Sequence, residues 1–160
     1  MTGLVLCSPA LTVPAERRDY LAARSTLAAR RGMRAIAEAT LDRSYPPALR
    51  GDGTEFLADR VRFLANDPVT YGYANMALVD ATLAPLLGTH CLPCHVLAGR
   101  HDLLRPPAQV AAIAACIPGA TFAIVESGHL MSVQAPDVVA GELAAADEIL
   151  LPLAAEGLCP

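Results

Sequence analysis

The sequence predicts an α/β fold with a short parallel sheet of about three strands and flanking helices, and three observations lead to this prediction. Three short apolar runs, GLVLCS, CHVLAG and TFAIVES, have the near-continuous hydrophobic character of strands buried on both faces. Segments with helical spacing follow the second and third runs. The order strand, helix, strand, helix is typical of parallel sheets that carry helices on their faces.

The first part of the chain contains one strand and then a long helical region. The first run, residues 3–8, ends at a proline. Residues 15 to about 87 have helical spacing and no convincing strand. One helical stripe there is formed by residues spaced i, i+4 and i+7: Leu57, Val61 and Leu64. Residues 43–55 are too rich in proline and glycine to be helical, so they divide this region into two parts. Asp67 stands directly before a proline, a combination typical of a helix start.

The C-terminal part alternates strands and helices. Residues 94–99 predict a strand, and residues 106–119 predict a helix that begins at a proline pair and ends at Pro-Gly. Residues 121–127 predict a further strand, and residues 136–151 predict a closing helix. This alternation supplies the remaining strands of the expected sheet and the helices that cover it.

Composition and charge restrict the class of protein. The 160 residues suffice for one domain with a hydrophobic core, and 54% of them are hydrophobic while 18% are charged. The formal net charge of −4 provides no basic field, so we expect no nucleic-acid partner.

The sequence contains neither a long apolar segment nor a signal peptide, and both observations bear on the compartment of the protein. No stretch approaches the roughly 20 apolar residues that cross a bilayer. The start, MTGLVLCSPALTVPAERRDY, lacks the basic flank and apolar length of a signal peptide. We therefore expect a cytoplasmic protein with no membrane partner, and its five cysteines, an odd number, are expected to be mostly free thiols.

An acid and a base follow two consecutive predicted strands. Asp102 comes shortly after the strand at 94–99, and His129 comes shortly after the strand at 121–127. Neighbouring parallel strands end at the same edge of a sheet about 4.8 Å apart, so the two side chains can meet there. An aspartate in that position can accept the Nδ1–H of the histidine and stabilise the imidazolium. Gly128 is expected to let the backbone approach closely and to leave room for the imidazole.

Each residue also has a structural interpretation. Asp102 fits a turn-forming or capping residue before the helix that begins near Pro106. His129 fits a hydrogen-bonded loop residue, since aspartate and histidine are common in loops. Their matching places at the ends of two consecutive strands favour the catalytic interpretation for the pair.

The segment VLAGRHDLLRPPAQVAAIAACIPGATFAIVESGHLMSVQAPDVV resembles the C-terminal part of an α/β-hydrolase, especially esterases and lactonases similar to 3-oxoadipate enol-lactonase. In that family a Gly-x-x-Asp strand end supplies the triad acid and a Gly-His after the last strand supplies the base. Here Gly99 with Asp102 and Gly128 with His129 match these positions, in the order expected for the fold. The resemblance implies hydrolysis of a small-molecule ester or lactone with Asp102 and His129 as catalytic residues. It requires no cofactor and no metal.

The resemblance also implies a division of the chain. Residues 1–14 would be a strand and linker of the hydrolase core, and residues 15–88 would be a helical cap. Residues 89–153 would form the C-terminal α/β core that carries the acid and base, and residues 154–160 would be a tail.

A nucleophile elbow with the pattern Gly-x-Ser-x-Gly is missing from the sequence. Ser8 follows a strand, but Pro9 stands where the elbow would enter its helix. Cys7 and Cys116 have no elbow context either. We therefore expect the nucleophile and the oxyanion-hole loop to lie upstream of Met1, and this chain to be inactive alone.

Two rival functions remain open. The motif THCLPCH, residues 89–95, contains Cys-x-x-Cys and two histidines, which suits zinc or redox chemistry. Against it, no second Cys-x-x-Cys is present, and the motif runs into a strand rather than opening a helix. The other rival is a non-catalytic, truncated hydrolase relative that acts as a binding or dimerisation module.

A three-strand sheet would also expose an apolar edge at residues 3–8, so we expect self-association through that edge.

Overall fold

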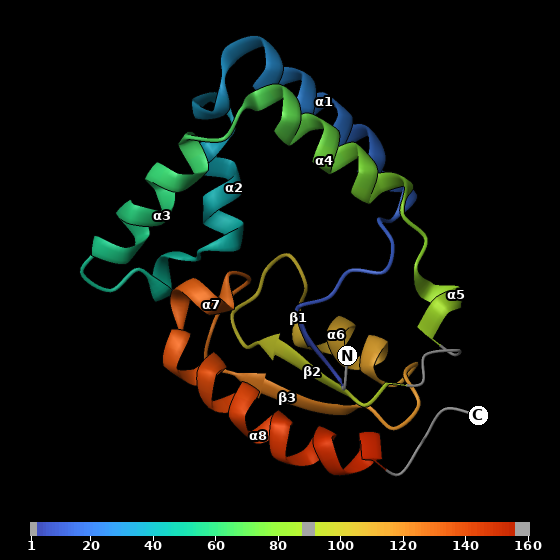
Figure 1. The fold of residues 1–160 in the computed structure, drawn as a ribbon. Coiled ribbons are helices and arrows are strands. Elements are labelled where there is room, and N and C mark those ends of the chain that lie inside the picture. Colours follow the sequence, from blue (N-terminus) through green and yellow to red (C-terminus); the bar gives the residue numbers. More distant parts are fainter. Residues whose placement is uncertain (1–2, 88–91, 156–160) are drawn as a thin grey trace. The chain divides into compact units, whose positions relative to one another are not determined.

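The computed structural model describes residues 3–87 and 92–155 and divides the chain into two compact units (Figure 1). One unit consists of Met1–Pro9 and Ala84–Pro160, and the other is Ala10–Leu83. Residues 88–91 and 156–160, which include most of the predicted tail, lie outside the described residues. The predicted division of the chain at residues 14, 88 and 153 stays a prediction.

The first unit contains the parallel sheet that the sequence predicts. Strands β1 (Leu4–Cys7), β2 (Cys94–Gly99) and β3 (Thr121–Val125) lie in the order β1-β2-β3. Both pairings are parallel, with Leu4 opposite Cys94 and His95 opposite Thr121. The α/β fold class with a three-strand parallel sheet is therefore confirmed.

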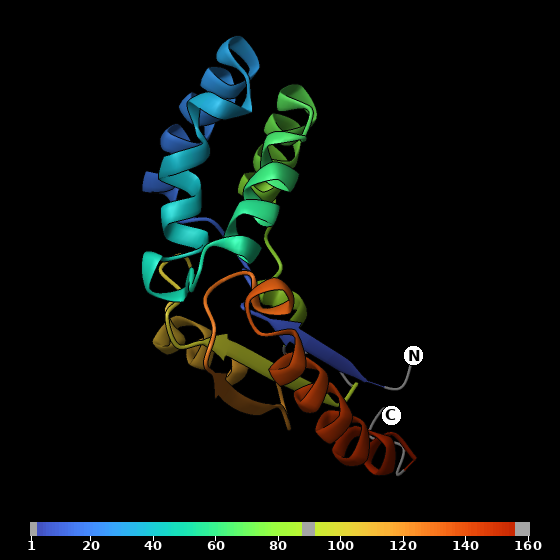
Figure 2. The same cartoon turned by 90° about the vertical axis from the view of Figure 1, so that its left-hand side faces the viewer.

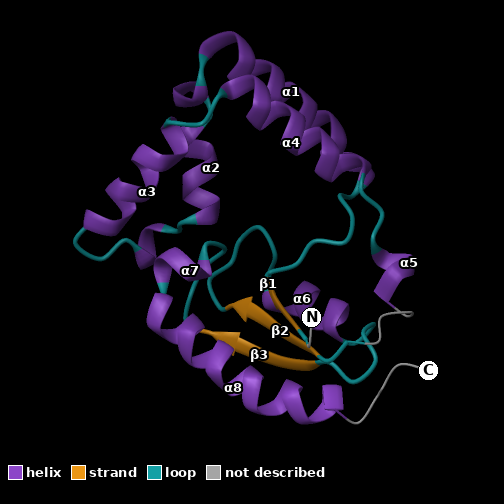
Figure 3. Ribbon diagram, viewed as in Figure 1, coloured by secondary structure: helices purple, strands orange, loops and turns teal. Residues whose placement is uncertain are grey.

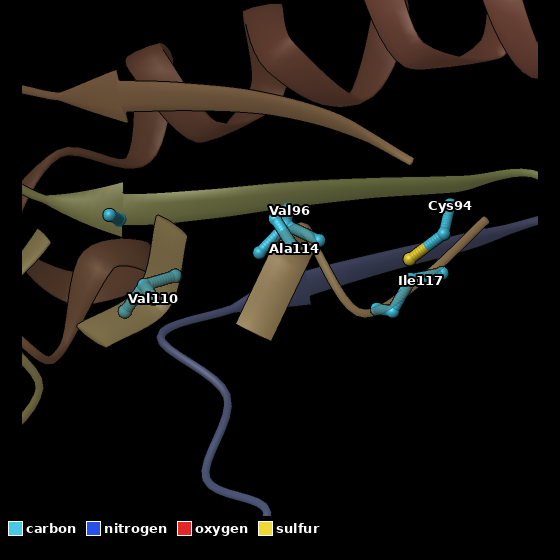
Figure 4. Packing of buried hydrophobic residues seen from close by; sticks show 6 residues of the cluster. Cys94, Val96, Val110, Ala114 and Ile117 are labelled. Atoms are coloured by element: carbon cyan, nitrogen blue, oxygen red, sulfur yellow. The ribbon is translucent and has the colours of Figure 1, made fainter. Parts of the chain in front are cut away.

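Successive side chains of β2 point to opposite faces of the sheet, so both faces present buried side chains. Helices cover each face. On one face α6 (Pro107–Ala114) packs on the sheet (Figure 2). Side chains of β2, of α6 and of the turn after it form a buried cluster there (Figure 4): Cys94, Val96, Ala98, Val110, Ala114 and Ile117. The opposite face carries α7 (Met131–Gln134) and α8 (Pro136–Ala155), and its buried cluster is Leu97, Val125, Met131 and Val139. A short helix, α5 (Ala84–Leu87), precedes β2 in the chain.

The second unit is helical, as the sequence predicts (Figure 3). Its elements are α1 (Ala15–Arg31), η1 (Met33–Ala35), α2 (Ala37–Ser44), η2 (Pro47–Leu49), α3 (Thr54–Leu64) and α4 (Pro68–Asp80). Its buried cluster contains Ala28, Met33 and Ile36, with Phe63 and Tyr71 packed against it. The side chain of Asp67 accepts the backbone N–H of Thr70 at 2.7 Å, so the predicted helix start is confirmed.

One detail of the helical prediction differs from the structure. The predicted stripe does lie on a helix, α3, but Leu57 is 59% exposed and Val61 is 66% exposed. Leu64, the third residue of the stripe, packs with Phe63 against the cluster around Met33, and Asp59 is buried on this helix. None of the helices within the described ranges combines the length and apolar character of a membrane span.

Candidate active site

The structure brings the predicted acid and base together at the carboxyl edge of the sheet. Asp102 lies in the loop after β2, and His129 lies in the loop after β3. The Nδ1 atom of His129 is 2.9 Å from Oδ2 of Asp102, within hydrogen-bond distance. Both loops belong to the same compact unit, and their pairing is the geometry that the strand-end positions predict. The catalytic role of the pair stays a prediction.

The carboxylate of Asp102 serves two purposes with its two oxygens. Its Oδ1 accepts the backbone N–H groups of Leu104 at 2.7 Å and Arg105 at 2.8 Å, which closes a tight turn. Its Oδ2 faces His129. The turn-forming interpretation and the pairing with His129 are therefore both correct for Asp102. A helix-capping role is not, because Pro106 occupies the N-cap of α6.

Charge on Asp102 is stabilised although its side chain is fully buried, at 0% exposure. Burial alone raises the pKa of this carboxyl. Hydrogen bonds from His129 and from the backbone N–H of Arg105, together with the nearby hydroxyl of Ser8, act in the opposite direction. Their sum holds the pKa of Asp102 below its usual value. The acid is therefore an anion at neutral pH, which is the form that accepts an imidazole N–H.

Close backbone packing joins the two loops. The backbone N–H groups of Arg100 and His101 donate to the carbonyls of Val125 and Ser127, each at 2.9 Å. A Cβ atom on Gly99 would lie 2.3 Å from the carbonyl oxygen of Gly128, so only glycine fits there. The sequence prediction placed a close backbone approach at Gly128, and the carbonyl of Gly128 makes this approach to Gly99, whose missing side chain allows it. That Gly128 also leaves room for the imidazole stays a prediction.

A glutamine anchors the loop that carries the histidine. The side-chain Oε1 of Gln134, in α7, accepts the backbone N–H of Gly128 at 2.8 Å. The same atom lies 3.3 Å from the hydroxyl of Ser127, which is completely buried. Sequence reasoning missed Gln134 because its type and position in a short helix carry no signal for this contact.

Charged side chains that neighbour Asp102 and His129 in sequence pair with one another. Glu126 accepts a hydrogen bond from Arg100 Nε at 2.8 Å and pairs with Nε2 of His101. These two partners, His101 first, hold the pKa of Glu126 below its usual value. The three side chains are next to the site in sequence but make no bond to Asp102 or His129.

The free face of His129 is accessible. Its side chain is 31% exposed, and within the described part of the chain no group forms a hydrogen bond to its Nε2. With Nδ1–H donated to Asp102, Nε2 of the neutral ring carries a lone pair and can accept a proton. The hydroxyls of Ser8 and Ser127 are buried and make no bond to this histidine, so neither has the geometry of a nucleophile.

The Cys-x-x-Cys rival finds little geometric support in its described half. Residues 89–91 lie outside the described residues. Cys94 is buried in the cluster on the α6 face (Figure 4). The ring of His95 contacts Thr121 of β3 and Glu142 of α8. Adjacent strand residues point to opposite faces, so Cys94 and His95 cannot share one metal ion. Across the described ranges no group of three or more histidine, cysteine, aspartate or glutamate side chains could hold one.

Comparison with solved structures finds consistent similarity to hydrolases. An esterase from Thermogutta terrifontis, solved with malate bound, superposes with a TM-score of 0.85 at 24% identity, over 93% of this chain and 56% of the esterase. The enol-lactonase of Burkholderia xenovorans gives 0.81 at 25% identity, over 91% of this chain and 56% of the lactonase. A hydrolase from Pseudomonas aeruginosa gives 0.79 at 25% identity, over 90% and 54%.

These comparisons confirm the resemblance to α/β-hydrolases that the motifs indicate. The chain spans a little over half the length of the solved structures that it matches. No protein-family model and no curated protein matches the sequence.

Proposed function

We propose that this chain, which has the fold of the C-terminal part of an α/β-hydrolase, supplies the acid and base of a hydrolase for carboxylic esters or lactones. The observation that carries the proposal is the 2.9 Å contact between His129 Nδ1 and the buried carboxylate of Asp102. A partly exposed imidazole held by a buried anion at the carboxyl edge of a parallel sheet is suited to general-base chemistry.

In this mechanism His129 takes a proton on Nε2 from a nucleophilic serine that attacks the ester or lactone carbonyl. Asp102 keeps the ring in the Nδ1–H tautomer and stabilises the imidazolium. The proton then passes from Nε2 to the leaving alkoxide oxygen, and the acyl group stays on the serine. Water, deprotonated by the same His129, releases the acid and regenerates the serine. No cofactor takes part in these steps.

The serine is proposed to come from residues outside this chain. No serine of the sequence has the Gly-x-Ser-x-Gly context, and no described hydroxyl bonds Nε2 of His129. The chain by itself is therefore expected to give no serine-hydrolase turnover. The non-catalytic alternative, a binding or dimerisation module, is not favoured by any feature of the described residues.

The test begins with the DNA upstream of the Met1 codon. An open frame that encodes Gly-x-Ser-x-Gly shortly before GLVLCS is expected, and the extended protein is expected to hydrolyse p-nitrophenyl butyrate or a simple lactone. Replacing His129 with alanine in the extended protein should lower kcat by at least about 10³-fold. A stop codon in that frame would favour the non-catalytic alternative.

Two outcomes would contradict the proposal directly. A folded extended protein that hydrolyses neither ester nor lactone would exclude this activity. Labelling of the 160-residue chain by a fluorophosphonate probe, lost on His129→Ala, would show that the chain contains its own nucleophile.

A further inference from the structure

Ser8 is a buried serine at the edge of the sheet that also carries Asp102. It directly follows β1, and its backbone N–H donates to the carbonyl of Leu97 in β2 at 2.9 Å. The residue is only 5% exposed. Its hydroxyl is nevertheless buried without a hydrogen-bond partner of ordinary geometry. A buried hydroxyl without a partner is unfavourable, so its presence calls for an explanation.

The backbone of Ser8 is also strained. With φ at 45° it is the one non-glycine residue of the described ranges that has a positive φ. Glycine adopts this conformation without strain, and asparagine adopts it more easily than serine does. Strained residues cluster at functional sites, where the surrounding structure holds them in place. A strained and buried serine suggests that its hydroxyl has a local role.

Asp102 has the acceptor that this hydroxyl lacks. Its Oδ1 already receives two backbone N–H groups, whereas Oδ2 receives, among the described residues, only the Nδ1–H of His129. A carboxylate oxygen has two lone pairs, so Oδ2 can accept one more bond. Ser8 is near enough to help lower the pKa of Asp102, although its present geometry falls outside ordinary hydrogen-bond limits.

We propose that Ser8 is a positioning residue for Asp102, with its buried hydroxyl donating to the carboxylate and so fixing the plane that faces His129. Three directions then restrain the carboxylate: the turn after β2, the imidazole and the end of β1. The consequence for catalysis rests on the proposed function. The contact between Ser8 and Asp102 does not, so the two can be tested separately.

The test is the acid titration of Asp102 in the 160-residue chain, followed by ¹³C NMR of its carboxyl carbon. Ser8→Ala removes the hydroxyl, and Ser8→Gly removes it while also relieving the strain at φ 45°. A donor to the anion stabilises the ionised form, so its loss should raise the pKa of Asp102 in both variants. The expected shift is about half to one pH unit.

A matched control is available in the other unit. Ser25 is a buried serine whose hydroxyl likewise has no hydrogen-bond partner. Ser25→Ala should leave the Asp102 titration unchanged, which separates a local effect from general loosening. If Ser8→Ala fails to fold, Ser8→Gly still gives the answer, because glycine fits the backbone conformation.

An Asp102 titration that is unchanged in Ser8→Gly would overturn the proposal. In the extended hydrolase, Ser8→Gly should lower kcat about 3- to 30-fold with little change in KM, since the proposed role of the hydroxyl is to position Asp102 and not to bind substrate. A shifted titration in a protein without ester or lactone hydrolysis would leave Ser8 as the partner of Asp102 and refute the proposed function alone.

Discussion

The carbonyl oxygen of Gly128 lies 2.3 Å from the place where a Cβ atom on Gly99 would be. The loop that carries His129 therefore packs directly on the end of β2, from which the Asp102 loop departs. Contact between two backbones leaves no flexible side chain to yield, and this contact fixes the separation of the acid and the base.

Gly99→Ala is expected to destabilise the chain by roughly 1–3 kcal/mol and to displace His129 from Asp102, because a backbone carbonyl must move. Urea unfolding measures the first effect, and loss of the hydrogen-bonded Nδ1–H proton signal of His129 in NMR measures the second. Gly141→Ala is the matched control, since nothing lies within 4 Å of its added Cβ on α8. It should stabilise the helix by up to about 1 kcal/mol. Equal stability of the two variants would contradict the steric argument.

Asp102→Asn tests the orientation of the imidazole without changing the shape of the acid. The carboxylate accepts Nδ1–H at 2.9 Å, so the neutral ring of His129 is expected as the Nδ1–H tautomer. An asparagine amide can instead donate to Nδ1, and the ring should then switch to the Nε2–H tautomer. The ¹⁵N chemical shifts of the ring distinguish the two forms, and in the extended hydrolase kcat should fall about 10⁴-fold. An unchanged tautomer would mean that Asp102 does not orient His129.

The order of the elements and the place of the acid and base could be predicted because each depends on local sequence. The run at 94–99 is a strand at those residues, and strand ends bring Asp102 beside His129. The bond from Gly128 N–H to the side chain of Gln134 could not be predicted, since a glutamine in a short helix carries no signal for it. Nor could the positive φ and the buried, unpartnered hydroxyl of Ser8, which depend on the packing around the end of β1. Periodicity also predicted α3 without showing which of its faces packs, so the exposure of Leu57 and Val61 appears only in the folded structure.

Glu142→Ala tests a buried polar contact at the opposite end of the sheet. The ring of His95 is buried, with Nδ1 2.6 Å from Thr121 Oγ1 and Nε2 3.1 Å from Glu142 Oε2. Removing the carboxylate leaves a buried ring nitrogen without a partner, so the free energy of unfolding should fall by about 1–3 kcal/mol. Glu38→Ala breaks an exposed ion pair with Arg60 and should cost less than about 1 kcal/mol. Equal losses in urea unfolding would argue against a structural role for His95.

Asp59→Asn is expected to stabilise the helical unit at neutral pH. Asp59 is 8% exposed, and burial raises its pKa, while Arg62 lowers it by a smaller amount. A carboxyl whose folded pKa is raised reduces stability when it is ionised. This loss shrinks as pH falls through the folded pKa and is gone below the ordinary, unfolded pKa. The variant should therefore gain up to about 1 kcal/mol at pH 7 and nothing at pH values where Asp59 is protonated. Urea unfolding at pH 7 and at about pH 3, below the ordinary aspartate pKa, measures this, with the exposed Asp42→Asn as control.

Cys7→Pro tests the proposed self-association through β1, whose outer edge has no strand partner within the described residues. The backbone N–H groups of Leu4 and Ser8 donate toward β2, so by alternation along the strand the N–H of Cys7 points to the outer edge. Proline there removes an outward donor while the bonds to β2 remain, and the exposed side chain at this position leaves room for its ring. The parent chain should form dimers or larger species as its concentration rises in light scattering, whereas Cys7→Pro should stay monomeric.

The matched control is Cys7→Ser, which keeps the backbone N–H and should associate like the parent. A parent chain that is monomeric at every concentration would show that this edge does not pair, and association of all three proteins would place the interface elsewhere.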